Sequence, residues 1–261
     1  MTIRTLIRSC GAYLPAKVLT NKDMEKIVET SDEWIVQRTG IRERHIAAEG
    51  ETTADMAIAA ARRALEASGL NGEDIDGVIV ATSTPDTTFP SVAVKVQAAL
   101  GAKGGPSFDV QAVCAGFVYA LTVCDSLIRT GAARRLILVG AEKRTSILNW
   151  EDRTTCVLFG DGAGAVVLEA DMNAAGTTGD TGILSTHLHA DGTLKDILYV
   201  DGGVSSTGTS GHIIMEGREV FRNAVSAMAD VVDEVLAHNK VSPDQIDWII
   251  PHQANVRIIE S

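Results

Sequence analysis

The chain contains few residues of several kinds, and each shortage excludes a class of protein. Of its 261 residues only four are cysteine, and aromatic residues make up 4%. Cys10, Cys114, Cys124 and Cys156 stand far apart, so they form none of the close pairs that zinc sites use, and we expect no metal. Basic residues number 23 against 34 acidic ones, a net charge of −11, which disfavours a nucleic-acid-binding protein.

Long apolar runs are missing as well. No run approaches the roughly 18 residues that a membrane helix needs. The first 14 residues lack the charged, apolar and small-residue order of a signal peptide. The sequence therefore predicts a soluble cytoplasmic protein that does not contact membranes, and in that reducing compartment a disulfide framework is not expected.

Apolar residues, by contrast, are abundant at 45%, and their spacing alternates between two periods. Helical spacing predicts helices at 53–70, 90–100 and 114–129, whereas short continuous apolar runs predict buried strands at 77–81, 106–110 and 135–140, with strand-like runs within 156–169. Alternating helices and strands favour an α/β fold with a parallel or mixed sheet covered on both faces.

The order of helix, acidic turn and apolar strand occurs twice. A predicted helix at 220–240 is followed by a turn that ends at Asp247 and by an apolar strand at 248–250, as the helix at 53–70 is followed by Asp76 and the strand at 77–81. One such match suggests a duplication into halves 1–172 and 173–261. The second half then lacks several strands and helices, so we expect the sequence to be truncated at its C-terminal end.

Cys114 is the candidate nucleophile. It lies where a strand ends and the helix at 114–129 is expected to begin, so unpaired backbone N–H groups there would stabilise a thiolate. Ala115 and Gly116 leave room for a substrate, as at the nucleophile turn of serine hydrolases. The alternative is a buried core cysteine, which we expect for Cys10, Cys124 and Cys156.

Among six histidines, His252 is the candidate partner of the cysteine. It follows the predicted strand at 248–250 and precedes a short helix expected at 254–260, whose positive end would help to keep the imidazole neutral. His187 and His189 are expected to alternate on a strand, where structural roles are favoured over metal binding. The Gly160–Gly164 segment matches a dinucleotide loop weakly, and we interpret it as close strand packing or a bulge.

Five motifs together resemble a known family, the β-ketoacyl-acyl-carrier-protein synthases III, which initiate type II fatty-acid synthesis. The motifs lie in the family's order at 31–47, 113–117, 159–165, 186–192 and 251–258. The resemblance implies a thiolase-like fold, a duplicated layered αβαβα arrangement whose second half is incomplete here. It also implies a homodimeric acyltransferase that uses a CoA thioester as substrate and needs no cofactor.

The resemblance implies a role for each candidate residue. Cys114 accepts the acetyl group of acetyl-CoA, and His252 stabilises the enolate formed by decarboxylation of malonyl-acyl-carrier-protein. Trp34 and Arg153 enclose the adenine of CoA and Arg38 contacts its phosphate, although Thr154 stands where the family has glycine. The remaining implied positions are Met215, Gly217 and Phe221 for pantetheine, Phe89 for the acyl pocket across the dimer, and Arg222 and Arg257 for docking the carrier protein.

Two family elements are absent from this sequence, an asparagine in a Gly-Asn-Thr-Ser segment and a glycine-rich loop near the C-terminus. Acyl transfer to Cys114 is expected to survive in part, and decarboxylation to be impaired. Two other functions stay open at this point: a thiolase-fold acyltransferase with another acyl-CoA primer, or an inert fragment that binds CoA or a carrier protein.

Overall fold

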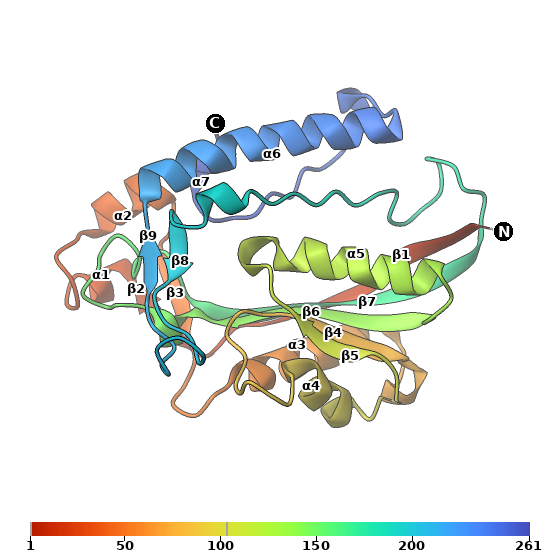
Figure 1. Cartoon of the computed structure of the whole chain (residues 1–261), viewed down its shortest axis with the longest axis horizontal. Helices are drawn as coiled ribbons and strands as arrows, with labels where there is room; N and C mark the ends of the chain where they lie inside the picture. The colour runs from red at the N-terminus through yellow and green to blue at the C-terminus, as the bar shows by residue number, and fades with distance from the viewer. Residues whose placement is uncertain (1, 103) are drawn as a thin grey trace. The chain divides into compact units, whose positions relative to one another are not determined.

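The computed structural model describes residues 2–102 and 104–261 (Figure 1). Contacts divide the chain into two compact units that alternate along the sequence. Unit 1 consists of residues 1–16, 47–143 and 161–188, and unit 2 of residues 17–46, 144–160 and 189–261. The predicted division at residue 172 follows the repeat rather than these contacts, and it stays a prediction.

Unit 1 is built on a five-stranded mixed sheet in the order β1-β7-β6-β4-β5. The two long strands β1 (Thr2–Tyr13) and β7 (Asp161–Ala174) pair antiparallel, and β7 also pairs antiparallel with β6 (Arg135–Lys143). The strands β6, β4 (Gly77–Ala81) and β5 (Ser107–Val110) run parallel. Every residue of β4 is buried, which explains why this strand is a continuous apolar run.

Helices cover both faces of this sheet (Figure 1). Helices α3 (Thr53–Ser68) and α4 (Val92–Leu100) form one core with Val78 and Val80. Helix α5 (Gly116–Arg129) packs on the other face, in a second core with Ile79 and Ala81. Alternate residues of β4 thus point into opposite cores, as the period of a strand requires.

Unit 2 consists of two antiparallel pairs of strands, four α-helices and connecting turns. Strand β2 (Lys17–Thr20) pairs antiparallel with β3 (Glu43–Ile46), and between them lie α1 (Asn21–Met24) and α2 (Asp32–Thr39). The second pair is β8 (Leu198–Val200) with β9 (Ile213–Met215), and the long helix α6 (Gly217–Asn239) and the short α7 (Val256–Ile259) follow. The 3-10 turns of the chain are η1 (Gly72–Asp74), η2 (Val113–Ala115), η3 (Arg144–Ile147), η4 (Gly192–Leu194) and η5 (Pro243–Gln245).

Among the described residues, the structure contains the helix and the acidic turn of the internal repeat in both copies, but the strand in the first copy only. Turns η1 and η5 follow α3 and α6, and each begins with a capping box, Asn71 with Asp74 and Ser242 with Gln245. The strand expected at 248–250 is wrong, however. In the described chain no strand pairs with this segment, and its three side chains are 66% to 86% exposed, whereas β4 is paired on both sides.

Several local expectations are corrected in the same way. Cys156 lies in a buried turn before β7 and not in a strand, and the segment of His187 and His189 is not a strand. Cys10 does lie in a strand but is exposed, because β1 is an edge of the sheet. The helix expected from residue 90 begins at Val92, since Ser91 is its N-cap.

Two findings concern other classes of site. None of the helices in the described part of the chain is long and apolar enough to span a membrane. Within the same residues, no three histidine, cysteine, aspartate or glutamate side chains form a group that could hold a metal ion.

Candidate active site

Cys114 lies on the turn between β5 and α5. The helix begins at Gly116 rather than at the cysteine, and Cys114 is the middle residue of the 3-10 turn η2. Val113, directly before it, has a φ of 49°, a left-handed conformation that a β-branched residue rarely adopts. The thiol-bearing residue is exposed. A strained turn that presents an exposed side chain resembles the nucleophile turns of other acyl-transfer enzymes.

The other cysteines are less suited to attack a thioester. Cys124 and Cys156 are fully buried. Burial raises the pKa of the Cys124 thiol to about 12, with a smaller contribution from Asp125. The pKa of Cys156 is also raised, mainly by burial. Because the thiolate is the reacting species, neither thiol is a good nucleophile at neutral pH, and Cys10 lies alone on an edge strand.

The start of α5 is packed closely against the sheet. A Cβ added to Gly116 would lie 3.3 Å from the Cβ of Ala81, at the end of β4. The small residues after Cys114 therefore let the turn sit directly on the carboxyl end of a central strand. This is the edge at which open α/β sheets bind ligands.

His252 belongs to unit 2 and lies in the extended segment before α7. It has an exposed surface, yet the protein around its imidazole lowers its pKa, mainly through desolvation and to a smaller extent through the positive charge of Arg144. The sequence also predicts a neutral imidazole, but from the positive end of a helix. That helix end is three residues further on, at the N-cap Asn255, so desolvation and Arg144 rather than the helix lower the pKa.

Trp34, Arg38 and Arg153 come together within unit 2. The indole of Trp34 packs on a core that includes Met24 and Ile35. The guanidinium carbon of Arg38 lies 4.7 Å from the centre of the indole ring, and that of Arg153 lies 5.2 Å from it. Both distances are typical of cation–π contacts.

The local structure around these residues explains their placement. Ser31 caps α2 by accepting a hydrogen bond from the Trp34 amide (3.1 Å), and the helix ends at Gly40, whose φ is 78°. Arg153 donates to the carbonyl of Glu29 (3.0 Å). Thr154, in place of the family's glycine, is engaged by Asp152, which accepts from its amide (2.9 Å) and its hydroxyl (2.6 Å).

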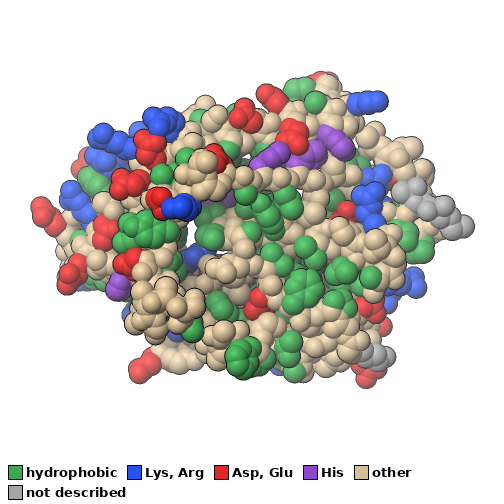
Figure 2. All heavy atoms as spheres, viewed as in Figure 1, with side chains coloured by type: hydrophobic (Ala, Val, Ile, Leu, Met, Phe, Trp, Pro, Cys, Tyr) green, Lys and Arg blue, Asp and Glu red, His purple; other side chains and the backbone are tan. Residues whose placement is uncertain are grey.

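A second group of predicted residues lies at the start of α6. A Cβ added to Gly217 would be in ordinary van der Waals contact, 3.7 Å, with the methyl group of Met215. Arg257 of α7 lies over the ring of Phe221, at 5.7 Å, whereas Arg222 forms an ion pair with Glu219. Figure 2 shows lysine and arginine side chains, with acidic ones among them, over the end of unit 2 that carries α2 and the start of α6.

Phe89 belongs to unit 1 and is 82% exposed, which is unusual for so large an apolar side chain. The segment Gly160–Gly164 is closely packed at its start, where a Cβ on Gly160 would lie 2.9 Å from the carbonyl oxygen of His45, whereas a Cβ on Gly164 would meet nothing within 4 Å. Two residues that sequence analysis missed are Val113 and Arg144, because neither a backbone angle nor a contact across turns leaves a local signal.

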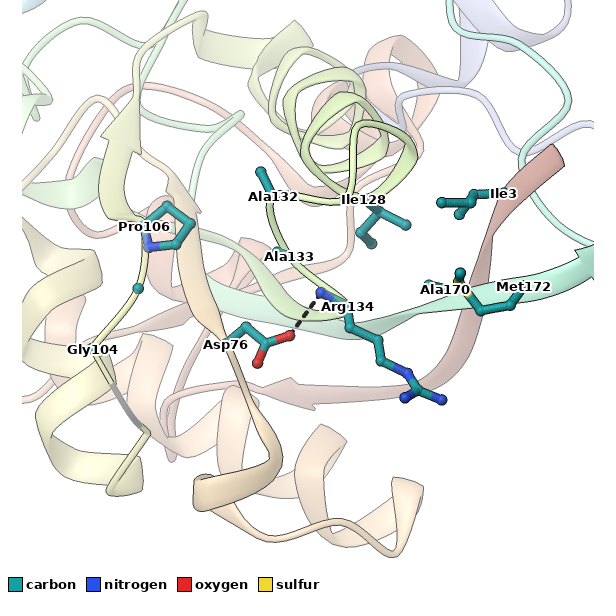
Figure 3. A pocket seen from close by; sticks show the side chains of 12 residues that line it. Ile3, Asp76, Gly104, Pro106, Ile128, Ala132, Ala133, Arg134, Ala170 and Met172 are labelled. Atoms are coloured by element: carbon teal, nitrogen blue, oxygen red, sulfur yellow. Dashed lines mark hydrogen bonds between the residues drawn. The ribbon is translucent and has the colours of Figure 1, made fainter. Parts of the chain in front are cut away.

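A cavity of about 510 Å³ lies within unit 1 (Figure 3). Its wall includes Ile3, Ile128 and Met172, and at its rim the Asp76 carboxylate accepts hydrogen bonds from the amides of Arg134 (2.7 Å) and Arg135 (2.8 Å). It lies at the amino ends of β4, β5 and β6, whereas Cys114 follows the carboxyl end of β5. Cys114 is therefore not part of this cavity.

Comparison with known proteins shows the family to which the chain belongs. The family model for 3-oxoacyl-[acyl-carrier-protein] synthase III matches residues 108–192, which include Cys114. The β-ketoacyl-[acyl-carrier-protein] synthases III of Rhodospirillum centenum and Paramagnetospirillum magneticum are each 60% identical over all of this chain and 80% of their own length. The chain belongs to the β-ketoacyl-acyl-carrier-protein synthase III family.

Solved structures of this family support the same assignment. The crystal structure of the Aquifex aeolicus enzyme, 49% identical, superposes with a TM-score of 0.89 over 98% of this chain and 79% of its own. That of the Pseudomonas aeruginosa enzyme, 38% identical, gives 0.90. The predictions of a thiolase-like α/β fold and of a condensing acyltransferase of fatty-acid biosynthesis are therefore confirmed.

Proposed function

We propose specific roles for the residues of this chain in the family reaction, which condenses acetyl-CoA with malonyl-acyl-carrier-protein to acetoacetyl-acyl-carrier-protein. The observation that carries the proposal is that Arg38, from the same helix as Trp34, and Arg153, which is distant in sequence, both lie over the indole ring of Trp34. An aromatic face with two guanidinium groups fits a nucleotide, because the ring stacks on a base and the cations face phosphate.

The side chain of Arg153 has to move when the adenine of CoA binds. A base stacked between Trp34 and Arg153 needs about 3.5 Å on each side, or about 7 Å in all. The guanidinium of Arg153 is 5.2 Å from the ring centre, so it has to withdraw by about 2 Å. Arg38 remains on the ring and contacts a phosphate of CoA. Met215, Gly217 and Phe221 line the path of the pantetheine arm.

Cys114 is the acyl acceptor. Its thiolate Sγ attacks the carbonyl carbon of the acetyl thioester, a bond forms between Sγ and that carbon, and the CoA thiolate leaves with the electron pair of the broken bond. The acetyl group is then held on the enzyme while CoA departs. The exposure of Cys114 and the burial of Cys124 and Cys156 support this choice of thiol.

His252 acts in the second half-reaction. Loss of carbon dioxide from the malonyl group leaves an enolate, whose carbon attacks the acetyl-enzyme and releases the Cys114 thiolate. A neutral imidazole donates a hydrogen bond from Nε2 to the enolate oxygen. The negative charge on this oxygen develops only as decarboxylation proceeds, so the hydrogen bond stabilises the transition state more than the bound substrate. The lowered pKa of His252 supports the neutral form.

The remaining predicted residues contact partners. Arg222 and Arg257 form the docking patch for the acidic carrier protein, and only side chains and the CoA thioester take part in the chemistry, without a cofactor. The enzyme acts as a homodimer in which Phe89 closes the acyl pocket of the partner. The 82% exposure of Phe89 supports this arrangement, and sedimentation equilibrium tests it.

The experiment that tests the nucleotide site compares two tryptophans. Trp34→Ala is expected to raise the KM for acetyl-CoA by roughly tenfold or more, in line with ~1–3 kcal/mol for a stacked base. Trp248→Ala is the matched control, since Trp248 is 84% exposed and lies outside the site. An unchanged KM in Trp34→Ala would contradict the proposal.

A further inference from the structure

Arg44 is a buried cation that is held by uncharged groups. It lies on β3 and is 4% exposed. Its Nη1 donates to the carbonyl of Leu19 (3.2 Å), and its Nη2 donates to Oδ1 of Asn21 and to the carbonyl of Val157, both at 2.9 Å. No carboxylate in the described part of the chain forms an ion pair with it, and its Nε has no hydrogen-bond partner there. A buried charge without a counter-ion is costly, so stability alone does not explain this residue.

The acceptors of Arg44 connect it to the two segments that form the proposed nucleotide site, helix α2 and the turn of Arg153. Asn21 donates from Nδ2 to Oδ1 of Asp32 and to the carbonyl of Ile41, both at 2.8 Å. Asp32 is the first residue of α2, the helix that carries Trp34 and Arg38.

The third acceptor belongs to the opposite side of that site. Val157 lies in the turn after Arg153, and this turn is closed by a hydrogen bond from the Cys156 amide to the Asp152 carbonyl (3.0 Å). Gly160 allows the close approach, because a Cβ there would lie 3.0 Å from the Cβ of Arg44. One guanidinium therefore joins the segment that supplies Trp34 and the segment that supplies Arg153.

We propose that Arg44 is a positioning residue for CoA, which fixes the turn of Arg153 relative to helix α2 and so sets the width of the slot for the base. The inference rests on the proposed role of Trp34 and Arg153. Arginine suits this task because its planar fork reaches acceptors in several directions, whereas the compact ammonium of lysine does not hold all three together.

Loss of the positioning role should affect two thioester substrates differently. Acetyl-CoA carries the nucleotide, and acetyl-pantetheine has the same thioester and arm without it. A variant that only misplaces the nucleotide site loses rate with acetyl-CoA and keeps its rate with acetyl-pantetheine. A variant that damages the fold or Cys114 loses both.

The experiment measures acetyl transfer to Cys114 from each substrate, by mass spectrometry of the intact 261-residue chain at timed intervals. Arg44→Lys is expected to lower kcat/KM for acetyl-CoA by about tenfold, with that for acetyl-pantetheine unchanged within about twofold. Arg42→Lys is the matched control, because Arg42 is exposed and stands two residues earlier, and it should change neither value.

Asn21→Ala is a second variant in case Arg44→Lys does not fold, as judged by its thermal unfolding. It cuts the link between Arg44 and Asp32 while the bonds to Leu19 and Val157 remain, so a smaller loss confined to acetyl-CoA is expected. Equal losses with both substrates, or no loss in either folded variant, would overturn the proposal.

Trp34→Ala in the same assay separates this inference from the proposed function. If its loss is confined to acetyl-CoA and those of Arg44→Lys and Asn21→Ala are not, the nucleotide site stands and the role of Arg44 is refuted. If Trp34→Ala does not discriminate between the substrates, the nucleotide assignment fails, and the inference fails with it.

Discussion

At the scale of single residues, the two catalytic candidates differ in what their surroundings do to them. Cys114 follows the strained residue Val113 on an exposed turn, whereas desolvation and, to a smaller extent, the charge of Arg144 lower the pKa of His252. These surroundings fit the proposed roles, in which the thiol attacks the thioester and the neutral imidazole donates a hydrogen bond. This division of labour predicts that the two half-reactions respond separately to substitution.

His252→Ala is expected to leave acetylation of Cys114 intact and to slow decarboxylation of malonyl-acyl-carrier-protein by about 10²–10³-fold, the usual effect of removing one donor to a developing oxyanion. The two steps are measured separately, by acyl-enzyme mass and by release of carbon dioxide. Cys114→Ser is the control that forms no acyl-enzyme. An equal loss in both steps would make His252 the base that activates the thiol.

The lowered pKa of His252 predicts the pH dependence of condensation. The imidazole stays neutral below the usual histidine pKa, so activity should persist into mildly acidic solution. Arg144→Gln removes the neighbouring charge, raises this pKa and should move the acidic limb of the rate profile upward. Arg144→Lys keeps the charge and should leave the limb in place; a shift of equal size in both variants would contradict the electrostatic cause.

The lowered pKa of His252 also makes the free energy of unfolding depend on pH. Because the pKa of His252 is lower in the folded chain, the unfolded chain takes up the proton first as pH falls. The contribution of His252 to folding is therefore present above its unfolded pKa and is lost as the pH falls toward the folded value.

At the scale of elements, the turn η2 stores strain next to the nucleophile. A left-handed φ costs a β-branched residue roughly 1–2 kcal/mol, which glycine does not incur. Val113→Gly should therefore keep or raise the midpoint of thermal unfolding while slowing acetyl transfer to Cys114, since the turn is less firmly fixed. Val113→Ala, which shortens the side chain but keeps the Cβ, is the control. A lower midpoint with an unchanged rate would show that the strain has no function.

Elements were predictable where local sequence and tertiary environment agree. Strand β4 was expected with its observed bounds, since a short apolar run between polar turns has no better place than the centre of a sheet. The similar run at 248–250 is not a strand, because a strand exists only with a partner to receive its backbone hydrogen bonds. Its pattern alone did not reveal that difference.

The site was less predictable than the fold. Position and small neighbours pointed to Cys114, but the meeting of Trp34 and Arg153 depends on how two distant segments pack, and only resemblance to a family indicated it beforehand. Arg44 gave no signal, because nothing in the sequence distinguishes a buried arginine on a short strand from the exposed Arg42 beside it.

At the scale of the whole molecule, the net charge of −11 opposes the approach of an acidic carrier protein, so docking has to depend on local basic residues. Arg257→Ala is expected to raise the KM for malonyl-acyl-carrier-protein several-fold at low salt, and less at high salt, where charges are screened. Arg222→Ala should have a smaller effect, because Glu219 already pairs with Arg222.

Acetylation of Cys114 from acetyl-CoA, which needs no carrier protein, serves as the internal control and should be unchanged in both variants. Steady-state kinetics at two ionic strengths provides the measurement. A KM that does not respond to salt in the parent chain would show that docking is not electrostatic.

The alternation of the two units along the sequence has a consequence for how the protein is made. Arg44 and its acceptor Val157 are 113 residues apart. At about 5–20 residues per second, a ribosome delivers the second roughly 6–23 seconds after the first. During that interval the newly made strands β2 and β3 contain Arg44 but lack its last acceptor, Val157, and helix α2 emerges without the turn of Arg153. The proposed nucleotide site is thus completed late in translation, and a chaperone that binds nascent chains would encounter helix α2 before the turn of Arg153 exists.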